Sequence, residues 1–139
     1  MTKWGLRRGL HVYAKGLPRR LKRKNPGKID GEWLFDVTCL EYGDGDYLQR
    51  AVLAVESEWG DEQDIYDDFE KLLICRAELR LFIFDRAALK VKWLRRCIQR
   101  GPLQAGDTYL LAGYDDEKKL FEFRRVDVDA DLRVATVAV

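Results

Sequence analysis

Residues 51–58 read AVLAVESE, an apolar run that ends in two carboxylates. Side chains alternate between the two faces of a strand. A strand over residues 48–58 would therefore group four side chains on one face: Val52, Ala54, Glu56 and Glu58. Carboxylates at the end of a buried strand are costly to ionise unless a cation lies beside them. This segment therefore predicts a metal site where a buried strand ends.

The segments around this strand predict further regular elements. Residues 33–42, WLFDVTCLEY, are rich in β-branched and aromatic types and predict a strand, followed by a GDGD turn at 43–46. A helix is predicted over residues 64–78, with Asp64 as its N-cap. Its apolar stripe has the spacing of one helix face: Ile65, Phe69, Leu72 and Leu73. The other expected elements are a strand at 79–84, a helix at 86–100, a hairpin of 108–112 with 119–128, and a strand at 132–139.

The order of these elements defines the expected fold class. A strand-helix-strand step gives a right-handed parallel crossover. The short turn at residues 43–46 gives an antiparallel pair before that step. We therefore expect an α/β (α+β) fold, in which a mixed central β-sheet is flanked by helices.

The charges of the 139-residue chain are unevenly distributed. Residues 1–28 contain ten Lys or Arg and no acid, whereas the remainder of the chain carries a net charge of −9. We expect a basic N-terminal arm over residues 1–28 and a single domain over residues 29–139. The arm either binds a polyanion or folds back onto the acidic body.

The cysteines and the apolar segments exclude several classes of protein. The three cysteines are far apart and odd in number, and His11 is the only histidine, so neither a disulfide scaffold nor a zinc site is expected. No apolar run approaches the length of about 20 residues that a membrane span needs. We therefore expect a cytoplasmic protein without membrane partners.

The acidic residues and the elements that carry them resemble the core of the PD-(D/E)xK nuclease superfamily, also called restriction-endonuclease-like. That pattern has an acid on one strand and an acid-x-lysine motif on the next, followed by a helix, a strand and a helix. Asp36 lies in the first of these strands here, and Glu56-Ser57-Glu58 ends the second. The resemblance covers residues 30–100 and implies a nuclease-like core.

Two positions depart from that family pattern. Glu58 stands where the motif has lysine, and the segment before Asp30 lacks the acid that many members carry on a preceding helix. Some members place the lysine on the following helix, where this chain has Lys71. Lys71 also follows Asp67 and Asp68 at helical spacing, which is typical of an ordinary surface ion pair.

The resemblance implies a metal-dependent nuclease that hydrolyses phosphodiester bonds of DNA or RNA. Asp36, Glu56 and the carbonyl of Ser57 would bind Mg²⁺ or Mn²⁺. The catalytic residues would be Asp36, Glu56, Glu58 and Lys71, with Glu58 holding a second ion or orienting water and Lys71 positioning the attacking water. Alternatively, Glu56 and Glu58 are solvent-facing residues at the end of a strand.

Basic residues suggest the partner. We expect nucleic-acid contacts from a cluster near Pro18: Arg19, Arg20, Lys22, Arg23 and Lys24. The helix predicted at 86–100 adds further bases, among them Arg86, Arg96 and Arg100. An alternative function is a catalytically inactive nucleic-acid-binding or protein-interaction module on the same fold. Exposed aromatic residues such as Trp59 would then mark a homodimer surface or a contact in a larger assembly.

Overall fold

A computed structural model describes residues 1–17, 24–25, 27–31, 33–86 and 91–139. In these ranges the helices are α1 (Thr2–Arg7), α3 (Glu62–Ile74) and α4 (Val91–Arg100), with a 3₁₀ turn η1 (Asp44–Asp46). The strands are β1 (His11–Ala14), β2 (Ile29–Asp30), β3 (Val37–Tyr42), β4 (Leu48–Glu58), β5 (Ala77–Asp85), β6 (Thr108–Asp115), β7 (Leu120–Val128) and β8 (Val134–Ala138).

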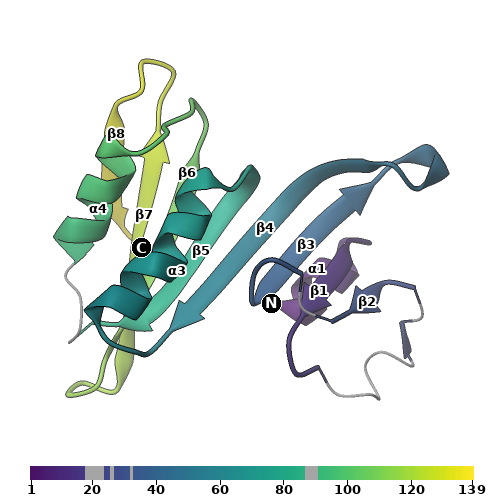
Figure 1. The fold of residues 1–139 in the computed structure, drawn as a ribbon, viewed down its shortest axis with the longest axis horizontal. Coiled ribbons are helices and arrows are strands. Elements are labelled where there is room, and N and C mark those ends of the chain that lie inside the picture. Colours follow the sequence, from purple (N-terminus) through teal and green to yellow (C-terminus); the bar gives the residue numbers. More distant parts are fainter. Residues whose placement is uncertain (18–23, 26, 32, 87–90) are drawn as a thin grey trace.

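All described strands belong to one mixed sheet with the order β2-β1-β3-β4-β5-β6-β7-β8 (Figure 1). The pairs β1/β2, β4/β5 and β5/β6 are parallel, and the other neighbours are antiparallel. The helix α3 makes the crossover between β4 and β5, and α4 makes the crossover between β5 and β6. The predicted fold class, a mixed sheet flanked by helices, is therefore confirmed.

Strand β4 spans the predicted residues 48–58, but its alternation is interrupted. Leu40 of β3 pairs with Ala51, and Cys39 pairs with Leu53, so Val52 is an extra residue in a β-bulge. Val52 packs with Leu53 in one core cluster, whereas Ala54 belongs to the other. The expectation that Val52 shares a face with Ala54 and Glu56 is therefore wrong. The extra residue in the bulge interrupts the alternation, so side chains before and after it do not follow one two-residue period.

Helix α3 begins earlier than predicted because its N-cap is Asp61 rather than Asp64. The Asp61 carboxylate accepts hydrogen bonds from the amides of Gln63 and Asp64, at 2.9 and 3.1 Å, and the Asp64 carboxylate accepts one from the Asp61 amide. This reciprocal capping box satisfies amides that have no partner within the helix. A Cβ at Gly60 would lie 2.3 Å from Asp64 Oδ2, so the absence of a side chain at residue 60 permits the cap.

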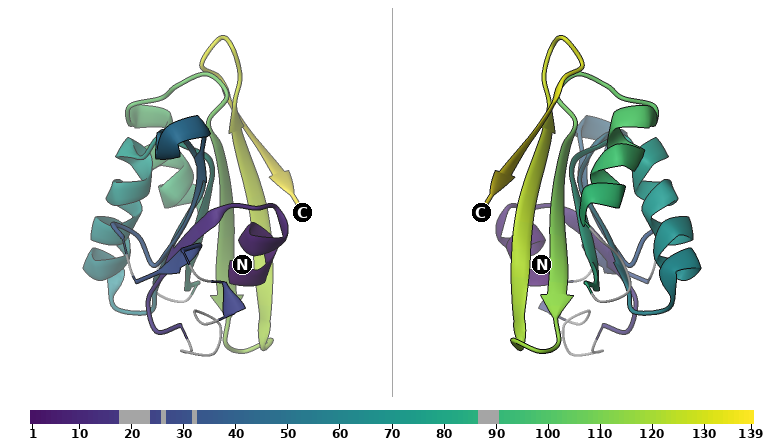
Figure 2. Two further views of the ribbon diagram at one scale, coloured as in Figure 1. Left: turned by 90° about the vertical axis from the view of Figure 1, so that its right-hand side faces the viewer. Right: turned by 90° about the vertical axis from the view of Figure 1, so that its left-hand side faces the viewer.

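Helices α3 and α4 cover one face of the sheet and α1 lies on the other (Figure 2). The described residues form a hydrophobic core on each of these faces. The larger core joins α3 and α4 to β5, β6 and β7 through residues such as Phe69, Phe82 and Leu94. The smaller core lies under α1 and includes Val12 and Cys39. Burying side chains of this size contributes about 1.5–3 kcal/mol each. Gly5 of α1 lies so close to this core that an added Cβ would be 2.8 Å from Val12.

The N-terminal segment and several element boundaries differ from the sequence expectations. Residues 2–14, which were assigned to the basic arm, form α1 and β1, so this part belongs to the same sheet. Strand β3 begins at Val37 rather than residue 33, because Leu34 has a φ of 62° and interrupts the extended backbone.

None of the described helices combines the length and apolar character that a membrane span requires.

Candidate functional site

Two predicted carboxylates meet where β3 and β4 pair. Asp36 lies directly before β3, and the register that pairs Val37 with Val55 brings Asp36 opposite Glu56. The Asp36 amide donates to Glu56 Oε2 at 3.4 Å, and the Ser57 amide donates to Asp36 Oδ2 at 3.0 Å. These crossed contacts fix the two acidic residues against each other on adjacent segments.

Glu56 is buried and incompletely satisfied. Only 3% of its surface is exposed, and no described residue forms a hydrogen bond with its Oε1 atom. Burial raises the pKa of Glu56 to about 7; Asp68 and Asp36 add to the increase, while Lys71 opposes it. The site therefore offers a buried carboxylate oxygen whose charge is only partly compensated.

Helix α3 supplies the cation that faces Glu56. Lys71 Nζ lies 3.6 Å from Glu56 Oε1 and 2.5 Å from Asp68 Oδ1. Asp68 and Lys71 share a helix face because they are three residues apart. The hydrogen bond to Asp68 is the main cause of a raised pKa of Lys71, so the amine is held as an ammonium group. The ion pair expected as an alternative is thus present, and it places the amine at Glu56.

The other two residues of the acidic motif have different contacts. Glu58 Oε1 accepts hydrogen bonds from the amides of Trp59 and Gly60, at 2.7 and 2.6 Å, and so closes the turn that leads into α3. The structure does not bring the Glu58 carboxylate to Asp36 among the described contacts. Ser57 contacts Asp36 through its amide, whereas its carbonyl was the expected metal ligand.

The donor set can be compared with the needs of a divalent cation. No group of three or more His, Cys, Asp or Glu side chains suited to a metal ion occurs among the described residues. Magnesium, however, is commonly held by one or two carboxylates, and waters and phosphate oxygens complete its coordination. Asp36 and Glu56 form such a pair, and Glu56 Oε1 accepts no hydrogen bond from a described residue and has the Lys71 ammonium at 3.6 Å, so a metal ion could add to its coordination.

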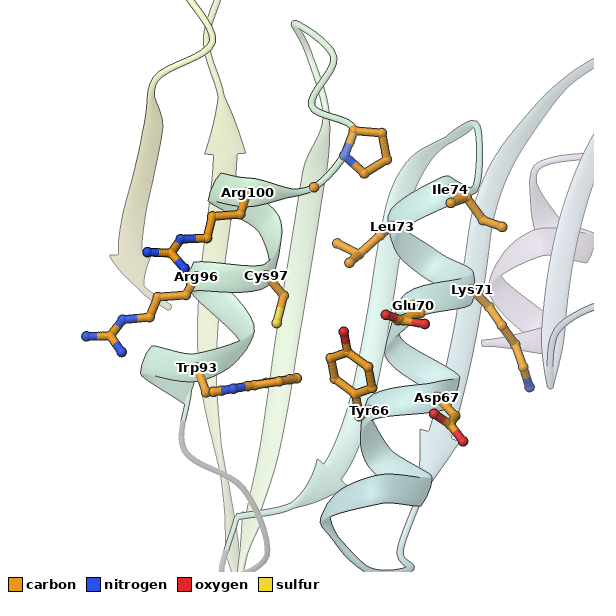
Figure 3. Close-up of a pocket in the computed structure, with 12 residues that line it drawn as sticks. Tyr66, Asp67, Glu70, Lys71, Leu73, Ile74, Trp93, Arg96, Cys97 and Arg100 are labelled. Atoms are coloured by element: carbon orange, nitrogen blue, oxygen red, sulfur yellow. The ribbon is translucent and has the colours of Figure 1, made fainter.

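Among the hollows that border α3 in the described part of the chain, two are lined in part by Lys71. A groove of about 730 Å³ separates α3 from α4, and its walls include Tyr66 and Trp93, whose ring centroids are 4.7 Å apart (Figure 3). The Lys71 amine points away from this groove, and Arg96 points away from α3. A second hollow, of about 680 Å³, lies beside α3 and is lined by residues of β3 and β4 as well as Lys71. Lys71 lines both hollows, and neither Asp36 nor Glu56 lines either of them.

The expected nucleic-acid-binding cluster is only partly described. Arg19, Arg20, Lys22 and Arg23 lie outside the described residues, and Lys24 is exposed. In α4, four basic side chains have no carboxylate within ion-pair distance in the described part of the chain: Lys92, Arg95, Arg96 and Arg100.

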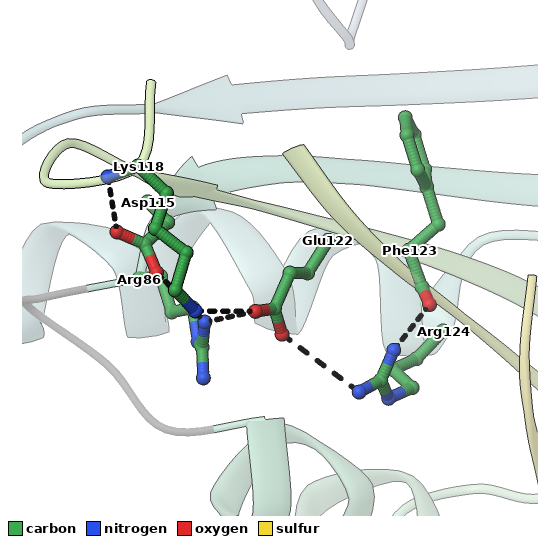
Figure 4. Close-up of polar contacts among 6 residues, drawn as sticks. All are labelled: Arg86, Asp115, Lys118, Glu122, Phe123 and Arg124. Atoms are coloured by element: carbon green, nitrogen blue, oxygen red, sulfur yellow. Dashed lines mark hydrogen bonds and ion pairs between the residues drawn. The ribbon is translucent and has the colours of Figure 1, made fainter. Parts of the chain in front are cut away.

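Arg86 has a different environment from the one expected. It follows β5 and precedes the described part of α4, and its guanidinium forms ion pairs with Asp115, at 3.0 Å, and with Glu122 (Figure 4). Lys118 joins the same network through Asp115 and Glu122. Because these charges are mutually compensated, Arg86 is a structural ion-pair partner between β5, β6 and β7.

Sequence reasoning missed the role of Asp68. Its spacing from Lys71 was noted as a surface pair, but its carboxylate also lies close enough to raise the pKa of Glu56. The sequence signal was present: an acid one turn before the lysine on the helix that follows the acidic strand.

No family model, curated protein or solved structure compared with this chain matches the chain. The function is therefore inferred from the site alone.

Proposed function

We propose that this protein is a metal-dependent nuclease that hydrolyses phosphodiester bonds at the Asp36–Glu56–Lys71 site. The observation that carries the proposal is the Glu56 carboxylate, which is buried, lacks a hydrogen bond at Oε1 and lies beside a second carboxylate. Burying a carboxylate in this way is costly, and the Lys71 ammonium, 3.6 Å from Oε1, offsets only part of the rise in the pKa of Glu56. A Mg²⁺ or Mn²⁺ ion held by Asp36 and Glu56 would support the ionised form of Glu56 and would supply the charge that phosphate chemistry requires.

The residues have separate tasks in this proposal. Asp36 and Glu56 would hold a divalent cation, which would neutralise charge on the phosphate and lower the pKa of a bound water. Lys71 lies at the open side of the pair, where its ammonium group attracts a phosphate oxygen or orients the attacking water. Asp68 holds the Lys71 side chain in that position through the 2.5 Å ion pair.

The arrangement of elements supports the same proposal. One acid precedes β3, the second lies in the antiparallel neighbour β4, the lysine follows on α3, and β5 returns parallel to β4. This is the order of the family pattern that the sequence resembles, with the lysine on the helix. Fold-level similarity carries no function by itself, so the proposal depends on the side chains.

The direct test is cleavage of labelled DNA and RNA, single-stranded and duplex, with Mg²⁺ or Mn²⁺ and with EDTA as the metal-free control. We expect cleavage that requires the metal and is lost in Glu56→Gln. Glu62→Gln is the matched control, because Glu62 is an exposed acid in the first turn of α3. Cleavage by Glu56→Gln at the wild-type rate would refute the assignment of the site.

Metal binding provides a second readout that does not depend on turnover. Calorimetric titration with Mn²⁺ should show a binding event in the wild type and in Glu62→Gln, and none in Glu56→Gln. Salt-dependent nucleic-acid binding without Mn²⁺ binding or cleavage would instead support the inactive binding module. The bases of α4 that have no carboxylate partner among the described residues are consistent with such binding.

A further inference from the structure

The second hollow beside α3 has no role in the proposed hydrolysis as described above. Its lining comes from residues 33–35, from β3 and β4, and from the C-terminal half of α3 with residues 75–76. Lys71 belongs to this lining and also lies 3.6 Å from Glu56 Oε1. Neither Asp36 nor Glu56 lines the hollow, but Phe35, the residue before Asp36, does, so the hollow borders the carboxylate pair through Phe35 and Lys71.

Large apolar side chains are exposed around this hollow. Trp33 is 41% exposed, Leu34 70%, Leu48 50% and Ile74 77%, and all four line it. Leu34 has a φ of 62°, an uncommon conformation for a leucine. Contiguous exposed apolar surface of this kind marks a binding site more often than an ordinary surface.

The charges in the lining define the chemistry of the occupant. The described lining residues include three cations, Arg50, Lys71 and Arg76, and no acid. Arg50 is paired with Glu41 and Glu78, and Lys71 with Asp68 and Glu56, whereas Arg76 has no carboxylate partner in the described part of the chain. The hollow is therefore complementary to a ligand that joins an apolar body to an anionic group.

An aromatic face is available in the same wall. The Trp33 ring packs against Tyr13 with centroids 5.8 Å apart, and the Trp33 carbonyl accepts a hydrogen bond from the Thr38 hydroxyl at 3.0 Å. These contacts hold the partly exposed indole in place. Indole rings of this kind stack on nucleobases without regard to sequence.

We propose that this hollow receives an unstacked nucleobase, so that the ligand of the protein is a single-stranded nucleic acid. The base lies against Trp33 and its phosphate meets Lys71, at the entrance to the Asp36–Glu56 pair. A base within a duplex is paired and stacked, so it enters such a hollow only after extrusion. The catalytic consequence, a preference for cleaving single strands, rests on the proposed function, but the binding does not.

Fluorescence anisotropy tests the binding directly. A labelled single-stranded oligonucleotide, as DNA and as RNA, is compared with the duplex of the same sequence in low salt and EDTA, so that no cleavage intervenes. We expect the single strand to bind at least about five-fold more tightly than the duplex, because one base-stacking contact accounts for about that factor or more. Equal affinities for the two forms would overturn the proposal.

Two exposed tryptophans offer a matched pair of variants. Trp33→Ala should weaken single-strand binding by about five-fold to about 100-fold, the range for loss of one stacking contact. Trp59→Ala should leave it unchanged, since Trp59 is 51% exposed but packs on Tyr114 and Phe121 outside the hollow. Equal effects of the two substitutions would contradict a base site at Trp33.

Ile74→Glu is a further variant at the surface of the hollow, and it should also weaken single-strand binding. Circular dichroism checks that each variant folds.

The outcomes separate this proposal from the proposed hydrolysis. Single-strand binding that depends on Trp33, without cleavage in Mg²⁺ or Mn²⁺, supports the base site and refutes the hydrolytic function. Metal-dependent cleavage that is equally fast on single strands and duplexes, with no effect of Trp33→Ala, refutes the base site and leaves the nuclease. A dimer in sedimentation that Ile74→Glu dissociates would show that a second copy covers the hollow, and this also overturns the base site.

Discussion

The Glu56→Gln substitution tests the electrostatic description of the site through protein stability. Glutamine has nearly the same shape as glutamate but cannot ionise. The pKa of Glu56 is raised from 4.5 to about 7, mainly by burial. One pKa unit corresponds to about 1.36 kcal/mol, so ionised Glu56 destabilises the metal-free folded state by about 3 kcal/mol.

The pH dependence follows from the direction of this shift. Between pH 4.5 and about 7 the folded protein binds more protons at Glu56 than the unfolded chain does, so stability falls as pH rises through this window. The destabilisation is absent below the window and complete above it. Glu56→Gln should therefore equal the wild type at about pH 4 and exceed its unfolding free energy by about 3 kcal/mol at about pH 8.

Urea denaturation followed by tryptophan fluorescence measures this difference across the pH range. Glu62→Gln serves as the control, because its exposed carboxylate should give no comparable pH-dependent gain. A difference between Glu56→Gln and wild type that stays constant with pH, or a less stable Glu56→Gln at about pH 8, would refute the reasoning. Mn²⁺ at a hundred-fold excess over its dissociation constant should stabilise the wild type and Glu62→Gln by about 2.7 kcal/mol, but not Glu56→Gln.

Three further predictions concern the fold and use urea or thermal denaturation. Arg80→Met should cost about 3–5 kcal/mol, because it removes the buried partner that lies 2.9 Å from Asp107. Asp61→Ala should cost about 1 kcal/mol, since it removes the capping box of α3. Gly5→Ala should cost about 1–3 kcal/mol, because the new Cβ would lie 2.8–2.9 Å from the core at Val12 and Cys39.

Each of these three predictions has a result that would contradict it. The double variant of Arg80→Met with Asp107→Asn should recover part of the loss, and no recovery would mean that the uncompensated Asp107 charge is not the cause. For Asp61, a loss equal to that of exposed Glu62→Ala would argue against a specific cap. Unchanged stability of Gly5→Ala would show that α1 shifts freely over the smaller core.

The sequence predicted the central part of the fold because its signals there are local. Strand β4 has an uninterrupted apolar run, and α3 has an apolar stripe with an acidic start, so both elements were found close to their observed positions. The convergence of Asp36 with Glu56 also followed from the order of elements. The interpretation of the early chain as an arm failed to anticipate β1, although His11–Ala14 alternate between partly and fully buried.

Other features depend on contacts that a linear pattern does not contain. The bulge at Val52 arises from pairing with β3, and the position of the Glu58 carboxylate arises from the turn at Trp59 and Gly60. Helix α3 ends at Ile74, four residues before its predicted end. The next residue, Cys75, has extended backbone, and its carbonyl accepts hydrogen bonds from the buried Arg80. These contacts join residues that are distant in the sequence or depend on the backbone conformation of a turn, so the pattern of residue types does not predict them.

The irregular pairing of β3 and β4 has a consequence for how this molecule tolerates change. Register shifts occur between Cys39 and Leu40 and again between Glu41 and Tyr42, so the far end of the hairpin is offset twice from the end that holds Glu56. Both register shifts lie between η1 and Glu56. An insertion at η1 would therefore change the tip of the hairpin and leave the pairing beside Glu56 as it is. That tip is a natural point for inserting a tag or another domain, or for opening the chain in a circular permutant.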